Sequence, residues 1–220
     1  MARLARVVAP GMPHHVTQRG NRRQRTFFCD DDYAAYVELM ADECRDEGVA
    51  IWAYCLMPNH VHLIAVPASE QGLRRAIGEA HRRYTRRVNL RENWRGYLWQ
   101  GRFASSVMDE PYLLAAARYV ELNPVRAKLV PDATEWRWSS ARAHLDGRDD
   151  RLVQVAPMLA MASDWRALLD SALPEEQLRT LRNHARTGRP LGGTAFLDRL
   201  EQLVGRVVRP RKRGRKPKFN

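Results

Sequence analysis

Two histidines separated by a single residue are the first feature of this sequence that suggests chemistry. His60 and His62 stand in the apolar run HVHLIAV, which follows a Met-Pro-Asn turn and ends at Pro67. Side chains two residues apart on a β-strand point to the same face, so the imidazoles would lie side by side while Val61 points into the core. Paired imidazoles suit a divalent metal ion. Because exposed strands also tolerate histidines that have no function, such a site needs a third ligand.

A tyrosine and an asparagine at helical spacing can complete the site. Tyr119 and Asn123 are four residues apart in RYVELNPV, one turn apart on the same face of a predicted helix. If this helix packs beside the histidine strand, Asn123 can offer an amide oxygen to a cation held by the histidines, with the phenol of Tyr119 nearby. The structural alternative is a core tyrosine and a helix-ending asparagine before proline.

Such a constellation suits the transfer of phosphodiester bonds. A divalent cation polarises the phosphate oxygens as a Lewis acid, and an aligned nucleophile attacks the phosphorus. A phenol, with an ordinary pKa of about 10, needs positioning and a nearby positive charge to act as that nucleophile. A phosphotyrosine bond retains the energy of the phosphodiester bond, so a strand can be cut and rejoined without ATP. This chemistry belongs to DNA rearrangement.

The charge of the chain indicates a polyanionic partner. The 220 residues contain 37 Lys and Arg against 25 Asp and Glu, a formal charge of +12. Seven basic residues lie in the last twelve positions, RPRKRGRKPKFN, which contain no acid. A second basic segment, 71–102, has nine arginines and two glutamates together with Tyr84, Trp94, Tyr97 and Trp99. Arginine suits phosphate and aromatic rings stack on unpaired bases, which favours a nucleic acid partner over a merely solvated helix face.

The order of the predicted elements indicates an α+β fold. Strands are expected at 15–19, 49–56, 60–66 and 98–108, and helices at 30–47, 69–88 and 109–123. This order is that of a ferredoxin-like split βαβ core with an antiparallel sheet. Helical patches follow at 158–169, 175–186 and 196–204. We therefore divide the chain into a core domain at 1–145, a helical C-terminal extension at 146–204 and a disordered basic tail at 205–220.

The same sequence disfavours other classes of protein. No stretch approaches the roughly 18 uninterrupted apolar residues of a membrane span, and the first apolar run is too short for a signal peptide. The three cysteines, Cys29, Cys44 and Cys55, suit neither a disulfide framework nor a cysteine metal cluster. We expect a cytoplasmic, nucleoid-associated protein with no membrane partner.

Three motifs in order give the sequence a resemblance to a known family. MPNHVHLIAVP (57–67), LWQGRFASSV (98–107) and RYVELNPVRAKLV (118–130) resemble the HUH-type single-tyrosine transposases of the IS200-like superfamily, and within them the REP-associated tyrosine transposases. PGMPHHVTQRGNRRQ (10–24) and TGRPLG (187–192) also resemble that group. The resemblance extends from Pro10 to Gly193.

The resemblance implies that 1–145 is a ferredoxin-like HUH catalytic domain. His60 and His62 would be its paired metal ligands, Tyr119 its attacking tyrosine, and Asn123 its third ligand, where relatives in the wider superfamily have glutamine. It also implies an enzyme that binds single-stranded palindromic DNA, folded as REP-type hairpins. The enzyme would cleave and rejoin this DNA through a 5′-phosphotyrosine intermediate that frees a 3′-hydroxyl, with Mg²⁺ or Mn²⁺ as cofactor.

Basic residues in several segments are candidates for holding the DNA. They are Arg19, Arg22, Arg23, Arg25, Arg82, Arg83, Arg86, Arg87, Arg102, Arg213 and Arg215. The last two belong to a tail that resembles a minor-groove AT-hook, although a nonspecific polybasic tail is the favoured interpretation. We expect the protein to act as a monomer rather than a homodimer.

Two other functions fit part of these observations. A ferredoxin-like sheet with arginines and aromatic residues can bind single strands without chemistry, as a non-catalytic regulator. A metal-dependent hydrolase of another class would use the histidines with an activated water and form no covalent adduct with DNA.

Overall fold

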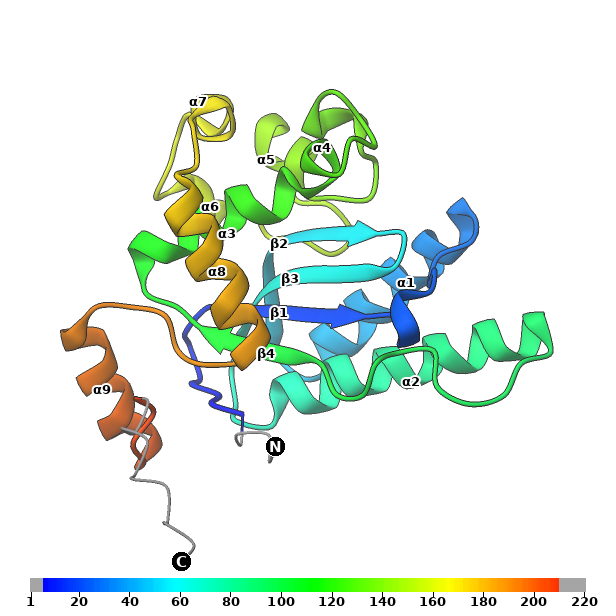
Figure 1. Ribbon diagram of the computed structural model, residues 1–220, viewed down its shortest axis with the longest axis horizontal. Helices are drawn as coiled ribbons and strands as arrows, with labels where there is room; N and C mark the ends of the chain where they lie inside the picture. The colour runs from blue at the N-terminus through cyan, green and yellow to red at the C-terminus, as the bar shows by residue number, and fades with distance from the viewer. Residues whose placement is uncertain (1–5, 210–220) are drawn as a thin grey trace, which may run out of the picture.

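A four-stranded antiparallel sheet lies at the centre of the computed structural model, which describes residues 6–209 (Figure 1). Its strands are β1 (His14–Arg19), β2 (Val49–Met57), β3 (His60–Pro67) and β4 (Ala104–Val107). They are arranged in the order β2-β3-β1-β4, so that β1 and β3 are central and every neighbouring pair is antiparallel. This is the sheet of a ferredoxin-like split βαβ core, and the predicted α+β fold is confirmed.

Helices occupy much of the rest of the described chain. The longer helices are α1 (Asp30–Asp46), α2 (Gly72–Glu92), α3 (Glu110–Glu121), α8 (Glu175–Thr187) and α9 (Thr194–Val204). The short ones are α4 (Asn123–Arg126), α5 (Ala141–Asp146), α6 (Ala156–Leu159) and α7 (Trp165–Asp170), with 3₁₀ turns η1 (Asn21–Arg23) and η2 (Ala133–Glu135). No helix within residues 6–209 is long and apolar enough to cross a membrane.

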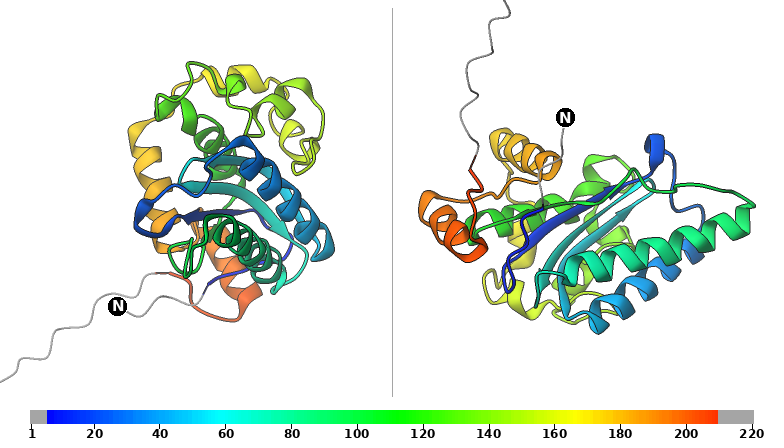
Figure 2. Two further views of the ribbon diagram at one scale, coloured as in Figure 1. Left: turned by 90° about the vertical axis from the view of Figure 1, so that its right-hand side faces the viewer. Right: turned by 90° about the horizontal axis from the view of Figure 1, so that it is seen from below.

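The two faces of the sheet are covered by different helices. Helices α1 and α2 lie side by side on one face, and α3 and α8 lie on the other (Figure 2). Alternate residues of β3 separate accordingly: Val61 and Leu63 join the core under α1 and α2, while Ile64 joins the core under α3. The period-2 pattern of β3 therefore decides which of its side chains face which helices.

The last strand is shorter than the sequence predicts. A strand is expected over 98–108, whereas β4 covers Ala104–Val107. Gly101, at φ 64°, adopts a left-handed conformation that turns the chain, and Trp99 forms an isolated bridge with Gly20 before that turn. Residues 98–103 are thus a loop that closes over the end of β1.

Helix ends also differ from prediction. The helix expected over 109–123 is two helices, because α3 ends at Glu121 and α4 begins at Asn123. Pro124 lies in the first turn of α4, where its missing N–H is not needed, so it opens a helix here. Similarly, the patch expected over 158–169 is divided between α6 and α7, and α2 begins at Gly72 without the predicted cap from Ser69.

The division into core, extension and tail stays a prediction, but its boundaries do not coincide with breaks in packing. Helix α5 runs across residue 145, and Val208 is buried against the core formed with α9. Arg209 forms ion pairs with Asp198 and Glu201 of α9. The described part of the predicted tail, 205–209, therefore packs on the extension, and the rest of the tail lies outside the described residues.

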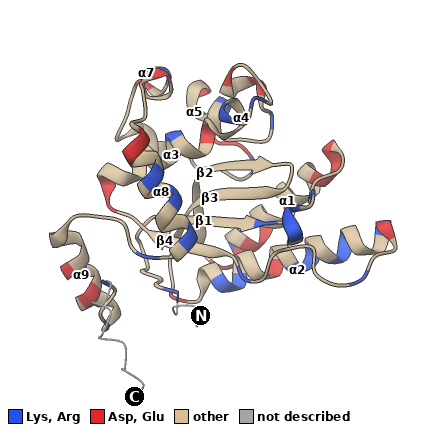
Figure 3. Ribbon diagram, in the orientation of Figure 1, with Lys and Arg blue, Asp and Glu red and all other residues tan. Residues whose placement is uncertain are grey.

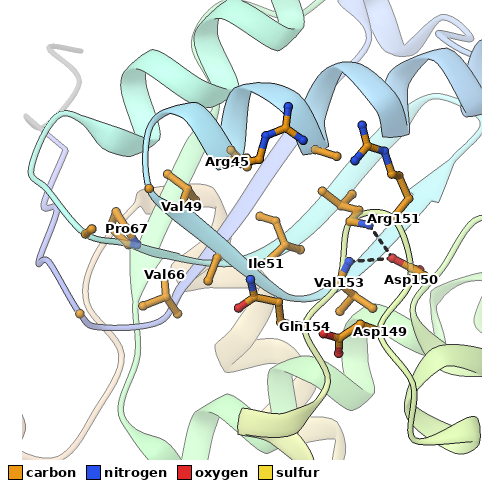
Figure 4. Close-up of a pocket in the computed structure, with 17 residues that line it drawn as sticks. Arg45, Val49, Ile51, Val66, Pro67, Asp149, Asp150, Arg151, Val153 and Gln154 are labelled. Atoms are coloured by element: carbon orange, nitrogen blue, oxygen red, sulfur yellow. Dashed lines mark hydrogen bonds between the residues drawn. The ribbon is translucent and has the colours of Figure 1, made fainter.

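A cavity of about 660 Å³ lies where the start of β2 and the end of β3 meet α1 and the loop 149–154 (Figure 4). Its arginines are engaged by neighbours, since Arg45 and Arg151 both pair with Asp42. Asp150 accepts two backbone N–H groups of its own loop. Because His60 begins β3, this cavity lies at the opposite end of the strand from the histidine pair.

A buried carboxylate joins the two helices of the first face. The fully buried Asp32 of α1 accepts hydrogen bonds from Arg91 of α2 and from the backbone N–H of Phe28. Burial alone would raise the pKa of Asp32, but these hydrogen bonds outweigh it and hold the pKa below its ordinary value.

We predict that Asp32→Ala lowers the free energy of unfolding at neutral pH by about 2 kcal/mol, because two donors lose a charged acceptor. Since the pKa is lower in the folded state, this stabilisation is fully present above the unfolded-state pKa of about 3.9 and is lost as pH falls through the folded-state value. Urea unfolding at several pH values measures it. Asp31→Ala, at the exposed neighbouring position, is the control, and equal losses in the two variants would contradict the assignment.

Candidate active site

Both histidines of the HVH motif lie on the face of the sheet that α3 covers. In the strand register, His60 is opposite Arg19 of β1 and His62 is opposite Thr17. The two ring centroids are 5.1 Å apart, while Val61 between them is buried under the helices of the other face. The imidazoles therefore lie side by side, as strand alternation predicts.

Each imidazole is held through its Nδ1 atom. His60 Nδ1 lies 2.6 Å from the side-chain oxygen of Asn59, whose amide nitrogen donates to the backbone carbonyl of Arg23. His62 Nδ1 lies 2.9 Å from Nε2 of His15, a buried histidine on β1. Within residues 6–209 neither Nε2 of the pair has a hydrogen-bond partner. When His62 donates to His15, both rings present an unprotonated Nε2 to a ligand.

The surroundings keep these rings neutral. Burial, aided by the charge of Arg19, lowers the pKa of His60 to about 4. Burial also lowers the pKa of His15 to about 4. The pKa of His62 lies well below its ordinary value because of burial and of the neighbouring histidines and Arg126. Neutral imidazoles are the form that binds metal ions.

Tyr119 of α3 lies against this cluster. Its ring centroid is 5.7 Å from that of His62 and 6.1 Å from that of His15, edge to face in both cases. The guanidinium carbon of Arg126 lies 4.2 Å from the centroid of the Tyr119 ring, and Arg126 donates to the Tyr119 backbone carbonyl. Burial lowers the pKa of Arg126, and the nearby Arg182 of α8 lowers it further. The phenol thus has the histidine pair and a cation as neighbours.

Small residues let α3 approach the sheet. Ala116, Ala117 and Val120 are fully buried and pack in one cluster with Ala53 of β2 and Ile64 of β3. Alanine side chains bring a helix backbone closer to a sheet than larger residues would. The half-buried ring of Tyr119 reaches the histidines from this backbone.

A buried glutamate fixes the end of α3. Glu121, fully buried, accepts hydrogen bonds from the Ser140 hydroxyl at 2.5 Å, from His144 Nδ1 at 2.7 Å and from Trp165 Nε1 at 2.8 Å. These donors come from outside the sheet, in the chain that follows α4. Segments far along the sequence therefore hold the helix that carries Tyr119.

Asn123 occupies the first position of α4, one turn beyond Tyr119. Its side-chain nitrogen is buried and has no hydrogen-bond partner within residues 6–209. The two ends of an amide are assigned from hydrogen bonds, so this unpartnered end is equally able to present the oxygen. In the described part of the chain, no three His, Cys, Asp or Glu side chains form a metal-binding cluster. Asn123 thus supplies a buried, unpartnered amide one helical turn beyond Tyr119.

Lys and Arg lie on α2 and α8 as well as on other segments (Figure 3). The predicted DNA-binding arginines within residues 6–209 fall into two groups. Arg82 and Arg83 on α2 pair with Glu79 and Glu43. The other predicted arginines are exposed and have no acidic partner in residues 6–209; they are Arg19, Arg22, Arg23, Arg25, Arg86, Arg87 and Arg102. Arg213 and Arg215 lie outside the described residues.

Sequence reasoning missed three residues of the site. The sequence alone shows His15 only as a strand residue. The strand register places Thr17 opposite His62, and His15, two residues before Thr17, therefore lies on the histidine face. Asn59 was assigned to a turn, and Arg126 was not singled out. The available signal for Arg126 was its position two helical turns after Tyr119.

The sequence matches the family described as IS200-like transposases over residues 10–123, which is more than half of the chain. The chain belongs to the IS200-like transposase family. This match confirms the family expected from the motifs, and it includes both histidines, Tyr119 and Asn123. A search of the curated proteins gives no match.

Among solved structures, this IS200-like transposase is similar to a REP-associated tyrosine transposase bound to a REP hairpin. The two chains share 20% identity with a TM-score of 0.58, over 69% of this chain and 90% of that one. A crystal structure of a candidate transposase from Deinococcus radiodurans R1 shares 20% identity with a TM-score of 0.39, over 55% of this chain and 96% of that one. The first of these two similarities supports the fold described above for this chain.

We predict that Glu121→Ala destabilises the protein by about 3 kcal/mol, because three donors lose a buried charged acceptor. Glu121→Gln keeps an acceptor and should retain part of the stability. Chemical unfolding followed by circular dichroism measures both variants. Glu110→Ala, at the exposed start of the same helix, is the control, and a comparable loss there would argue against this anchoring role.

Proposed function

We propose that this IS200-like transposase binds single-stranded hairpin DNA and cuts and rejoins it through Tyr119. The observation that carries the proposal is the contact of the Tyr119 ring with His62, 5.7 Å between centroids, beneath the cation of Arg126. In this proposal the histidine pair is the centre that binds the phosphate. A phenol held beside that centre and beside a positive charge is arranged for nucleophilic attack.

The proposed step exchanges one phosphodiester bond for another. The Tyr119 oxygen attacks the phosphorus, its bond to phosphorus forms, and the bond from phosphorus to the 3′ oxygen breaks. The phenol loses one proton and the leaving oxygen gains one, which yields a 5′-phosphotyrosine and a free 3′-hydroxyl. Attack by a 3′-hydroxyl on the phosphotyrosine reverses these changes and rejoins a strand.

We further propose that His60 and His62 hold a divalent cation through their Nε2 atoms, with Asn123 as third ligand. The free Nε2 atoms, the lowered histidine pKa values and the unpartnered amide of Asn123 support this set. Two imidazoles and an amide oxygen suit Mn²⁺ as well as Mg²⁺. When bound, the ion would polarise the phosphate oxygens.

The exposed arginines support a DNA substrate. Arg19 lies opposite His60 in the sheet, and the turn that follows carries Arg22 and Arg23. Because they have no acidic partner in the part of the chain that the structure describes, these guanidinium groups are available to phosphate. The similar transposase is bound to a REP hairpin, which favours a hairpin over an unstructured strand as the substrate of this chain.

We predict that the wild-type protein forms a covalent adduct with end-labelled single-stranded hairpin DNA when Mn²⁺ or Mg²⁺ is present. Tyr119→Phe should abolish the adduct, because it removes the attacking oxygen and keeps the ring that contacts His62. Denaturing gels measure the adduct, and DNA binding measured in parallel shows whether the variant still holds its substrate.

Tyr112→Phe is a matched control, since Tyr112 lies on the same helix, and it should leave the adduct unchanged. Tight binding without an adduct on any hairpin would favour the non-catalytic regulator. Products ending in hydroxyl groups without an adduct would favour the hydrolase.

We predict that His15→Phe weakens Mn²⁺ binding 10- to 100-fold, the usual effect of removing a partner of a ligand. Phenylalanine keeps a planar ring in the buried position but cannot accept from His62 Nδ1. Calorimetry or the electron paramagnetic resonance signal of free Mn²⁺ measures the affinity without DNA or turnover.

The adjacent His14 supplies the control for this variant. It is equally buried but its ring bonds with the backbone of Met12 and Ala9 and not with His62. His14→Phe should reduce stability without a comparable change in Mn²⁺ affinity. Equal losses of affinity in the two variants, or none with His15→Phe, would exclude the proposed role of His15.

A further inference from the structure

An open hollow of about 260 Å³ lies beside the turn that follows β1. Its walls include Asn21 and Arg22 of η1, Asn89 near the end of α2, and Trp94, Arg95 and Tyr97 of the loop that follows. A hollow of this size is smaller than the roughly 300–1,000 Å³ of a site for a drug-sized ligand. It suits a flat group such as a single nucleobase.

Two aromatic rings in this wall are exposed although their neighbours are buried. Trp94 is 45% exposed and Tyr97 is 86% exposed, whereas the next residues, Leu98 and Trp99, are 1% and 6% exposed. The loop thus buries Leu98 and one ring, that of Trp99, and leaves two rings at the surface. Exposed aromatic rings of this kind are surfaces on which bases can stack.

The arginines that line the hollow form no ion pair in the part of the chain that the structure describes. Arg22 and Arg95 have no acidic partner within residues 6–209. In contrast, Arg91 at the end of α2 pairs with Asp32 of α1 and with the adjacent Glu92. Arg22 and Arg23 have φ angles of 53° and 62°, a left-handed conformation that is unfavourable for residues other than glycine. A strained turn that displays arginines is typical of a binding surface.

Hydrogen bonds connect this hollow to the histidine pair. Gly20 donates its backbone N–H to the carbonyl of Asn59 at 2.8 Å, and the Asn59 amide donates to the carbonyl of Arg23 at 3.0 Å. The same Asn59 accepts from His60. On the other side, Asn21 donates to the carbonyl of Leu98 at 2.8 Å. The turn therefore touches both the candidate active site and the aromatic loop.

We propose that this hollow binds an unpaired nucleobase of the DNA strand whose phosphate reaches His60 and His62. The inference rests on the proposed function and adds where a single-stranded part of the substrate lies. Trp94 and Tyr97 stack on the base, and Arg22 and Arg95 neutralise the flanking phosphates. Asn21 and Asn89 line the hollow beside its polar edge, where the Asn89 amide nitrogen already donates to the carbonyl of Gly96. A base inside a duplex has its faces covered by neighbours, so the hollow selects single strands.

The experiment measures binding without cleavage. Full-length Tyr119→Phe protein in EDTA is titrated into a fluorescent oligothymidylate of about 12 nucleotides and into a blunt duplex of equal length. Adding Trp94→Ala and Tyr97→Ala should weaken binding to the single strand roughly 10- to 100-fold and change binding to the duplex less than about threefold. Replacing both residues by phenylalanine should restore most of the single-strand affinity.

Leu90→Ala is the matched control, because Leu90 is 72% exposed on the last turn of α2 and should leave both affinities unchanged. Unchanged single-strand binding in the double alanine variant, or equal losses on both DNAs, would overturn the proposal. Photocrosslinking of 5-bromodeoxyuridine in the single strand gives a second test. Attachment to Trp94 or Tyr97 supports the hollow, and attachment solely elsewhere contradicts it.

Cleavage is measured separately in protein that retains Tyr119. If the double alanine variant binds single strands normally and still forms the covalent adduct, the hollow is excluded and the proposed function stands. If the hollow binds single strands while no adduct ever forms, the proposed chemistry fails and the hollow stands.

Discussion

The packing of α3 on the histidine face of β3 is the contact on which the candidate active site depends. Strand alternation places His60 and His62 together, but it brings no nucleophile to them. Tyr119 reaches His62 because alanines on α3 let the helix lie close to Ala53 and Ile64 of the sheet. A larger residue at Ala116 would lift the ring from the histidines without touching any of the polar groups.

Burying three imidazoles on one sheet face is costly unless their polar atoms are bonded. Two hydrogen bonds offset this cost: His60 Nδ1 bonds with the side chain of Asn59, and His62 Nδ1 bonds with His15. The same bonds set which nitrogen of each ring is free. The same few contacts therefore satisfy the buried rings and set their orientation, and the turn at Asn59 extends this network to the arginines of η1.

The sequence was sufficient for what depends on local periodicity. The alternation of β3, the order of elements and the helical spacing from Tyr119 to Asn123 are local, and the sheet and helix α3 follow them. The contact of His15 with His62 joins residues 47 apart, and the three donors to Glu121 lie 19 to 44 residues away, so no local pattern contains them. Residues 98–108 read as one strand because the turn at Gly101 depends on pairing with β1.

The pairing of arginines is likewise a property of the fold, and it decides where positive charge can act. The packing of α1 on α2 brings Glu43 to Arg83 and Asp32 to Arg91, whereas Arg82 pairs with Glu79 on its own helix. At physiological salt, exposed charges act over about 8–10 Å. A net charge of +12 therefore says little by itself about the site. The arginines near His60, from Arg19 through η1, are among those without an acidic partner in residues 6–209. These exposed positive charges lie at the end of the sheet where His60 begins β3, and under the proposed function they would face the phosphodiester that enters there.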